Sequence, residues 1–264
     1  MPETTAAFNP QQTINDAIQV MFPLPCVVEI RSPKAGKNGT ICGYFELPQH
    51  IDRMVNAIME ISGDYNVYWT INPVDRSLLA RSANKLRHHM ETTTGDREII
   101  QRQWLPLDFD PQRATGISST DEEKRAARTL ASKVKKWLKG EMGWPDPVVA
   151  DSGNGFHLLY RIDLPNDDES RELLKAALDA LAHKFDTTSV KIDQKLFNAS
   201  RILKAYGSLA VKGDNMLERP HRMAQMFAPP ERIEIVSKAL LTALACLIHI
   251  FEDNKGLLCY KHVV

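Results

Sequence analysis

The sequence predicts a mixed α/β (α+β) fold. Short runs rich in β-branched and aromatic residues end at Gly, Pro or Asn, which is typical of strands. Between these runs lie segments whose apolar residues recur every three or four positions, which is typical of amphipathic helices. The chain of 264 residues is long enough for one large domain or two closely packed halves. It contains no internal repeat and no low-complexity tract.

Composition narrows the class of protein. The chain is 43% hydrophobic and 25% charged with a formal net charge of zero, as in an ordinary soluble globular protein. With this balance the protein as a whole has no positive potential of the kind typical of nucleic-acid-binding proteins. A local groove can still be basic, because net charge does not describe how charges are distributed. The four cysteines are widely scattered and lack zinc-ligand spacing, which fits a reducing compartment. The N-terminus has no signal-peptide pattern, and the longest apolar run (239–251) is shorter than the ~20 residues of a bilayer span. We expect a cytoplasmic protein with no membrane partner.

Turn chemistry and periodicity place the elements of the first part of the chain. Pro48 opens a helix whose apolar residues follow a period of 3.6 and which stops at Gly63. Asn72 precedes a proline, so it is held extended with its amide free to face a ligand, although a plain turn explains the same pattern. We expect a tail at 1–11, a helix at 12–21, strands at 26–31 and 40–46, a helix at 48–63, and a strand with a terminal turn at 66–74.

Residues 75–102 are rich in Arg, Lys and His and contain few acids. Such a run is usually a solvated face of a helix. In a chain whose charges otherwise balance, it is also the best candidate for contact with nucleic-acid phosphates. The two interpretations, surface helix and template contact, both remain open.

The most informative stretch is the short strand at 104–111, which ends in Asp108-Phe109-Asp110-Pro111. Side chains alternate along a strand, so Asp108 and Asp110 point to the same face. Two adjacent carboxylates repel each other in a dry site, and a divalent cation removes that conflict. Hard oxygen ligands suit Mg²⁺ or Mn²⁺. The alternative is a solvated strand end that binds nothing.

The second part of the chain alternates helices with strands. Two overlapping capping boxes, Ser119 with Glu122 and Thr120 with Glu123, begin the first helix. We expect helices at about 121–139, 170–185 and 232–251, a hairpin at 148–162, and strands at 190–196 and 223–227. On the strand at 190–196, Asp193 lies among apolar neighbours. The end of the last helix is apolar almost all round, so it is expected to be buried in this domain or to dock a further C-terminal part.

The hairpin at 148–162 carries several potential hydrogen-bond donors at its tip. Gly153, Asn154 and Gly155 form its turn, and glycine allows backbone N–H groups to approach an anion closely. Ser152 and His157 flank this turn as further donors. An ordinary hairpin beside an ordinary edge-strand histidine explains the same residues.

Taken together, these residues suit nucleotidyl transfer. Three carboxylates, from Asp108, Asp110 and Asp193, are about the number needed to hold two divalent ions. The triphosphate needs N–H groups and cations, because the transition state is mostly charge to be stabilised. The candidate cations are His157, Arg201, Lys204, Lys212 and Arg222.

These motifs resemble the catalytic core of the archaeo-eukaryotic primase superfamily, and more narrowly the primase-polymerases of plasmids, phages and CRISPR-associated loci. Asp108-Phe109-Asp110 matches the first motif, and Ser152 to His157 the second. The third is matched by Ile192-Asp193 with Arg201 and Gly207-Ser208, and flanking elements by Asn72-Pro73, Lys212-Gly213 and Arg219 to Arg222. The matches follow the family's order over residues ~66–222. Tyr206 departs from the pattern, which has a small residue or proline before the glycine.

The resemblance implies a two-part core, in which an N-terminal αβ unit packs on an RRM-like palm with the active site in the cleft. It also implies synthesis of primers, their extension, or both, on single-stranded DNA from nucleoside triphosphates. By this resemblance Asp108, Asp110 and Asp193 hold two Mg²⁺ or Mn²⁺ ions. The nucleotide-binding set is Asn72, Ser152, Gly153, Asn154, Gly155, His157, Arg201, Lys204, Lys212 and Arg222.

We expect residues 1–264 to form one catalytic domain, with a tail and helix at 1–25, a core at ~26–230 and a C-terminal helix at ~231–264. The expected partners are the single-stranded template, the primer strand and a C-terminal helicase domain, zinc domain or separate protein. Two other functions remain. A metal-dependent replication initiator or nuclease of the rolling-circle type needs a His-apolar-His pair, which His88-His89 does not provide. A catalytically silent DNA-binding module has no need of all three aspartates.

Overall fold

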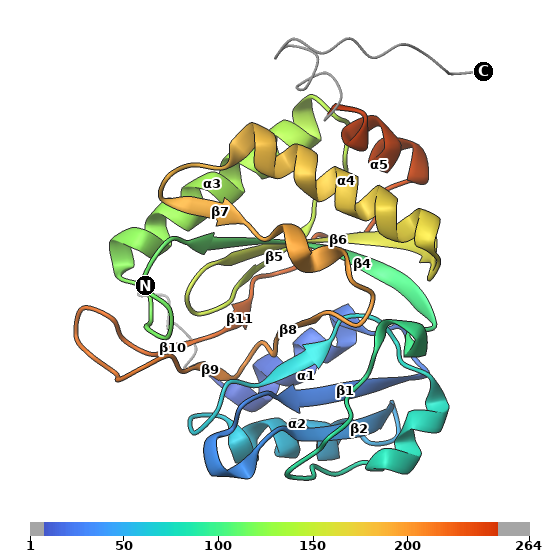
Figure 1. Cartoon of the computed structure of the whole chain (residues 1–264), viewed down its shortest axis with the longest axis vertical. Coiled ribbons are helices and arrows are strands. Elements are labelled where there is room, and N and C mark those ends of the chain that lie inside the picture. Colours follow the sequence, from blue (N-terminus) through green and yellow to red (C-terminus); the bar gives the residue numbers. More distant parts are fainter. Residues whose placement is uncertain (1–7, 248–264) are drawn as a thin grey trace, which may run out of the picture.

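The computed structural model describes residues 8–247, which form two antiparallel sheets with helices packed around them (Figure 1). The predicted α+β fold class is confirmed. The N-terminal sheet contains β1 (Cys26–Ser32), β2 (Ile41–Leu47), β3 (Tyr68–Thr70) and β8 (Ile202–Lys204), in the order β2-β1-β3-β8. The C-terminal sheet contains β4 (Gln101–Pro111), β5 (Val148–Asp151), β6 (Phe156–Pro165), β7 (Val190–Ile192) and β11 (Gln225–Met226), in the order β11-β5-β6-β4-β7. A short pair, β9 (Leu209–Ala210) and β10 (Arg222–Met223), lies between them.

Helices cover each sheet. Figure 1 shows α3 (Asp121–Gly140), α4 (Asp168–Phe185) and α5 (Lys238–Ala245) on one side of the C-terminal sheet, with the N-terminal sheet on the other side. On the N-terminal side, α1 (Pro10–Met21) contacts both α2 (Ile51–Ile61) and β11. None of the described helices is long and apolar enough to cross a bilayer.

Local sequence explains most of these boundaries. Asn9 caps α1 by accepting a hydrogen bond from the Gln12 N–H (3.2 Å), and Pro10 takes the first helical position. Of the two overlapping capping boxes, the structure uses Thr120 with Glu123 to begin α3. Ser119 instead donates its backbone N–H to the Asn154 side chain (2.8 Å).

Several predicted boundaries were wrong. The strand expected at 190–196 ends at Ile192, because the Asp193 side chain accepts the Lys195 N–H and caps a 3₁₀ turn at Gln194–Phe197. The strand expected at 223–227 is divided at Ala224, so that β10 pairs with β9 and β11 with β5. The strand expected at 66–74 is only the three residues of β3.

The last helix was also placed wrongly. The helix expected at 232–251 begins only at Lys238, where the Ser237 hydroxyl caps it. The final residues of that expected helix, from 248 onward, lie outside the described residues. What the apolar end of the chain packs against therefore stays a prediction.

The basic run at 75–102 is not a surface helix. It contains two 3₁₀ turns, Arg76–Arg81 and Asp96–Glu98, its last two residues begin β4, and the rest is irregular and forms isolated bridges to β2 at Ala83 and Arg87. Buried Glu29 fastens this segment to the sheet by accepting hydrogen bonds from Arg31 and from the Thr94 N–H (3.0 Å). Four of its arginines are bonded within the fold: Arg76 to Glu46, Arg81 to Glu98, Arg87 to the Arg81 carbonyl and Arg102 to the Phe197 carbonyl. Much of the expected phosphate-binding charge is thus used internally.

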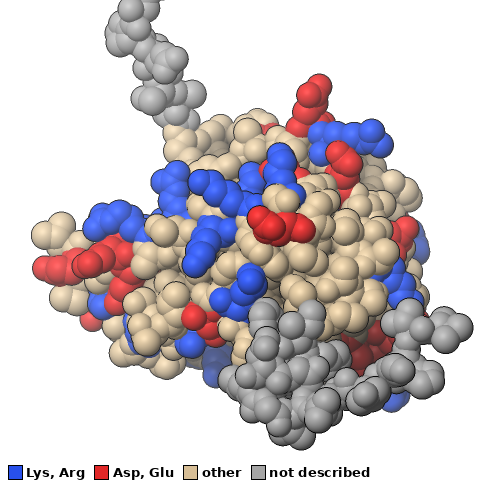
Figure 2. Space-filling view, turned by 90° about the horizontal axis from the view of Figure 1, so that it is seen from above, with Lys and Arg blue, Asp and Glu red and all other residues tan. Residues whose placement is uncertain are grey.

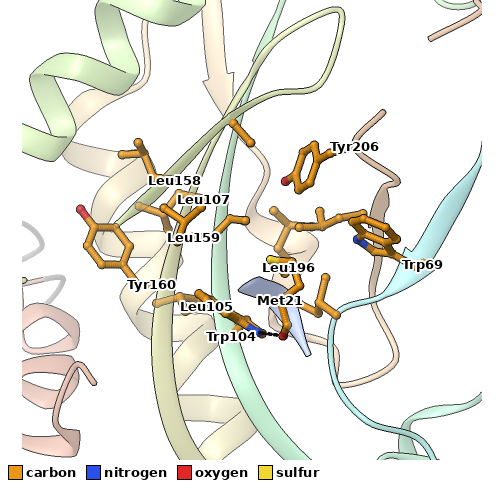
Figure 3. Close-up of a cluster of buried hydrophobic side chains, with 14 of the residues drawn as sticks. Met21, Trp69, Trp104, Leu105, Leu107, Leu158, Leu159, Tyr160, Leu196 and Tyr206 are labelled. Atoms are coloured by element: carbon orange, nitrogen blue, oxygen red, sulfur yellow. Dashed lines mark hydrogen bonds between the residues drawn. The ribbon is translucent and has the colours of Figure 1, made fainter. Parts of the chain in front are cut away.

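The two sheets share one hydrophobic core. Figure 3 shows Trp104 and Leu105 of β4 beside Met21 of α1, with the Trp104 indole N–H donating to the Met21 carbonyl (2.8 Å). Tyr206 meets Trp69 of β3 edge to face, with 5.8 Å between the ring centroids. Because large side chains from both parts interlock, the cleft between the sheets has closely packed walls.

Candidate active site

A cavity of about 390 Å³ opens where the two sheets meet. Tyr68 and Lys204 line it from the N-terminal sheet, and Asp108 and His157 line it from the C-terminal sheet. Nine of the predicted site residues line this cavity: Asp108, Asp110, Ser152, Asn154, His157, Asp193, Arg201, Lys204 and Lys212. Residues that are far apart in the sequence thus meet in one place.

Strand β4 is responsible for this convergence. It lies between β6 and β7, and its register with β6 sets Asp108 directly opposite His157. On the other side, the Asp193 N–H donates to the Asp108 carbonyl (3.0 Å), just where β7 ends. Phe109 turns into the core between the two acids and is fully buried. The alternation expected from the sequence places both carboxylates in the cavity.

Asp108 and Asp110 differ electrostatically. Burial acts to raise the pKa of Asp108, but His157, whose Nε2 lies 3.4 Å from its carboxylate, together with Lys212 and Arg113 lowers the pKa below its ordinary value. For Asp110, burial and the charge of Asp108 raise the pKa, and the contact with Arg113 (2.9 Å) only partly offsets them. The pair therefore carries the repulsion that a bound cation would relieve.

Asp193 is engaged by its own neighbours. One carboxylate oxygen accepts the Lys195 N–H (2.9 Å), and the other accepts from Arg201 (2.9 Å). Within residues 8–247, no three His, Cys, Asp or Glu side chains converge closely enough to form a complete metal site. The donor set nevertheless fits a hard divalent cation, since all three candidate ligands are carboxylates on one cavity. Asp193 would have to exchange Arg201 for the ion.

The tip of the β5–β6 hairpin is held by its own hydrogen bonds. The Gly153 N–H donates to Asp151 (2.7 Å), and the Gly155 N–H donates to the Ser152 hydroxyl (2.9 Å). We expected these N–H groups to face an anion, but both are already satisfied. The glycines are required for packing instead: a Cβ on Gly155 would clash with the Phe109 carbonyl, and one on Gly153 with Ala210 and Arg222.

Besides Gly153 and Gly155, two predicted ligands do not line the cavity. Buried Asn72 donates to the Ala199 carbonyl (2.9 Å) and accepts the Gln103 N–H (2.7 Å), so its amide joins β4 to the segment around Ala199. Arg222 binds Asp121 (2.6 Å) and the Ser119 carbonyl (2.8 Å) and so fastens β10 to the start of α3. Asn154 lines the cavity, but its side-chain oxygen is held by Ser119.

Lys204 of the N-terminal sheet and Lys212, which follows β9, supply positive charge to the cavity. The Lys204 ammonium donates to the Leu209 carbonyl (2.8 Å) and lies over the Tyr68 ring, 5.6 Å from its centroid. Burial, assisted by the neighbouring charge of Lys212, lowers the pKa of Lys204 to about 7. An anion in the cavity would favour the protonated form of this side chain.

Four residues of the site were not predicted from the sequence. Asn66 and Tyr68 line the cavity, Arg113 binds Asp110, and Tyr206 bonds to His157. Tyr68 and Arg113 lie next to recognised motifs, and that proximity was the only available signal. Tyr206 was noted solely as a departure from a pattern.

No family model matches this sequence, and a search of curated proteins finds no match. Among solved structures, the fold is similar to the crystal structure of primase RepB', with a TM-score of 0.50 and 10% identity over 94% of this chain and 66% of that chain. A second similar structure is the catalytic domain of primase RepB' in complex with initiator DNA, with a TM-score of 0.48 and 10% identity over 94% of this chain and 100% of that chain. The chain thus spans about two thirds of the first of these proteins. The likeness shows a primase-type fold.

Proposed function

We propose that this chain is a primase-polymerase, which synthesises or extends primers on single-stranded DNA from nucleoside triphosphates. The observation that carries the proposal is the meeting of Asp108, Asp110 and Asp193 with His157 and three cations around one cavity of a primase-type fold. A structural cluster of acids has no need of three cations around the same cavity or of a histidine directly beside Asp108.

The carboxylates form one half of the proposed mechanism. When bound, two Mg²⁺ or Mn²⁺ ions would activate the primer hydroxyl and neutralise charge on the triphosphate. Asp108 and Asp110 would hold them from alternate positions of β4, and Asp193 would join after releasing Arg201. Arg201 would then be free to contact a phosphate oxygen, which a guanidinium can do with two hydrogen bonds.

The cations and His157 form the other half. Lys204, Lys212 and the released Arg201 would offset the charge that accumulates on the triphosphate during transfer. His157 would donate a hydrogen bond to a phosphate oxygen from the same side as Asp108. Lys204, Lys212 and His157 line the cavity before the nucleotide enters, which limits the reorganisation needed during the reaction.

The test is primer synthesis on single-stranded DNA without a supplied primer, with labelled nucleotides and Mg²⁺ or Mn²⁺, resolved on a gel. We expect template-dependent products from the wild type, and a loss of at least about a thousandfold in Asp108→Asn, the scale of removing a principal charge-stabilising group. Asp168→Asn, which alters an exposed acid on α4, serves as the matched control and should retain activity. Binding of Mn²⁺, followed by electron paramagnetic resonance, should weaken in Asp108→Asn alone.

Other outcomes separate the alternatives. Extension of a supplied primer without initiation would make the protein a polymerase that needs a partner to start. Cleavage of the DNA would indicate a nuclease. Intact DNA binding with neither synthesis nor cleavage would overturn the proposal in favour of a silent binding module.

A further inference from the structure

We propose that Tyr206 is a positioning residue that sets the orientation and tautomer of His157. The inference deepens the proposed function, because it concerns how that site presents a hydrogen-bond donor to the nucleotide. The Tyr206 hydroxyl lies 2.8 Å from Nδ1 of His157, and both side chains are buried. On the other side of the imidazole, Nε2 lies 3.4 Å from the Asp108 carboxylate.

The ring of Tyr206 is itself held in place. It meets Trp69 edge to face at an interplanar angle of 76°, and Trp69 is fully buried in the shared core. Figure 3 shows the hydroxyl of Tyr206 directed away from Trp69. A rigid partner of this kind limits the rotation of the imidazole more than a mobile side chain or water would.

Hydrogen-bond accounting selects the tautomer. Among the described residues, His157 Nδ1 is the only hydrogen-bond partner of the Tyr206 hydroxyl. A buried O–H without an acceptor is unfavourable, so the hydroxyl donates and Nδ1 accepts. Burial together with the charges of Asp108 and Asp151 raises the pKa of Tyr206 well above its ordinary value, so the phenol keeps this proton. The ring hydrogen of His157 therefore lies on Nε2, the nitrogen that faces Asp108 and the cavity.

This hydrogen bond is a physical reason for Tyr206, the residue that departs from the primase-like pattern. A small residue or proline at position 206 would leave Nδ1 of a buried histidine without this partner. The imidazole could then expose either nitrogen to the cavity, and only one of them carries a donor.

The test compares Tyr206→Phe with Tyr160→Phe. Both changes remove one hydroxyl from a buried ring, but the Tyr160 hydroxyl has no hydrogen-bond partner in the described structure. The first readout is the ¹⁵N NMR spectrum of the histidine side chains, with the His157 signals assigned from a His157→Gln variant. We expect the wild type and Tyr160→Phe to show the Nε2–H tautomer, and Tyr206→Phe to show a mixture.

The second readout is steady-state nucleotide addition. In Tyr206→Phe we expect KM for the nucleoside triphosphate to rise about five- to tenfold with a smaller change in kcat, as for the loss of one hydrogen bond. Unchanged ¹⁵N signals in Tyr206→Phe, or the same changes in Tyr160→Phe, would overturn the inference. Because the NMR readout does not depend on synthesis, it still decides the role of Tyr206 if the wild type adds no nucleotides.

A separate observation concerns the outer surface of α3. Figure 2, which looks down on the helix layer, shows Lys and Arg side chains gathered on one part of it with few acids among them. The exposed residues along this side of α3 are Arg125, Arg128, Thr129, Ser132, Lys133 and Lys136, here named the basic α3 face. In the part of the chain that the structure describes, its four cations form no ion pair with an acid.

We infer that the basic α3 face binds the phosphate backbone of the DNA strand that leaves the cleft. Arg and Lys interleaved with hydroxyl groups are the side chains that contact phosphates without reading sequence. Arg128, Thr129, Ser132, Lys133 and Lys136 line a shallow groove on this face. The helix begins at the hairpin tip, where Ser119 binds Asn154, so a strand emerging there would reach Arg125 within one turn.

The inference rests on the proposed DNA substrate and is tested by fluorescence anisotropy of single-stranded DNA over a salt series. One variant changes Arg125, Arg128, Lys133 and Lys136 to Gln. The matched control changes Lys34, Lys37, Arg53 and Arg232 to Gln, four exposed cations that lie outside both α3 and the basic run at 75–102. We expect affinity to fall at least about tenfold in the first variant only, and the salt slope to decrease by ~0.7 for each phosphate that this variant no longer neutralises.

Equal weakening in both variants, or no weakening in the first, would overturn this inference. The proposed function fails separately, if the wild type neither binds single-stranded DNA nor adds nucleotides. Wild-type binding that is weakened equally by changes on either surface leaves the proposed function intact.

Discussion

Lys204 shows how burial changes the chemistry of a single residue. Its ammonium lies in the cavity wall, 5% exposed as a residue, with a backbone carbonyl as its hydrogen-bond acceptor. Burial and Lys212 lower its pKa from an ordinary 10.5 to about 7. In the unfolded chain the side chain stays protonated up to its ordinary value, so between these two pH values the unfolded chain binds more protons than the folded one.

The sign of the pH dependence follows. The cost of burying the charge is fully present below about pH 7 and disappears as the pH rises towards 10.5, because the folded protein then holds a neutral amine. The difference in unfolding midpoint between Lys204→Met and wild type should therefore favour the variant most near pH 6. This difference should decrease steadily up to about pH 9.5. Thermal unfolding followed by circular dichroism measures this difference. A difference that does not vary with pH would show that Lys204 titrates normally in the fold.

The residues of the site differ in how far the sequence reveals them. Asp108 and Asp110 were predictable, because a strand that ends in Asp-x-Asp directs both side chains to one face whatever its neighbours are. Asn72 was not, because its amide binds backbone groups of Gln103 in β4 and of Ala199, 31 and 127 positions away along the chain. Tyr206 carried no local signal, since its only polar partner among the described residues, His157, lies 49 positions away.

At the scale of elements, β4 and the β5–β6 hairpin are the parts that build the site. The hairpin tip packs so closely on β4 that position 155 has no room for a side chain beside the Phe109 carbonyl. This contact keeps the hairpin in the register with β4 in which Ser152 and His157 line the same cavity as Asp108. Gly155 was predicted from the sequence as a turn residue. In the structure it is also required because β4 leaves no room for a side chain at this position.

Gly155→Ala should therefore displace the hairpin from β4. We expect a loss of stability of about 1–3 kcal/mol, as for overpacking of a closed interface, together with weaker nucleotide binding. Urea unfolding and titration with a nucleoside triphosphate measure the two effects. The control is Gly140→Ala, at the end of α3, where an added Cβ meets no atom within 4 Å and should leave both properties unchanged or stability slightly higher. Equal behaviour of the two variants would show that the hairpin tip is not closely packed.

Element boundaries were predicted best where a cap or a period is local. The amphipathic helices α2, α3 and α4 were placed within a few residues, because their apolar stripes and caps are encoded side by side. The short strands were placed less well: β7 ends at the 3₁₀ turn that Asp193 caps, although its partner β4 continues, and β10 and β11 make only short pairings with β9 and β5. Thus β7 stops at Ile192, and the predicted single strand at 223–227 serves two different partners.

At the scale of the whole molecule, the N-terminal sheet is completed from the far end of the chain. β8 pairs with β3, and Tyr206 follows it directly into the shared core against Trp69. The chain then passes through β9, β10 and β11 back to the C-terminal sheet. This crossing brings Lys204 of the N-terminal sheet to the same cavity as the aspartates of the C-terminal part.

The sequence by itself determined the mixed α+β class, the main helices and the three aspartates with their hairpin, because these depend on periodicity, caps and residues a few positions apart. Tertiary structure alone decided which polar groups remain free for a ligand. Asn72, Arg222 and the hairpin N–H groups are satisfied within the fold, whereas Lys204 and His157 face the cavity. The physical reason is that a buried polar group must find a partner, and that partner is set by sheet register and long-range packing.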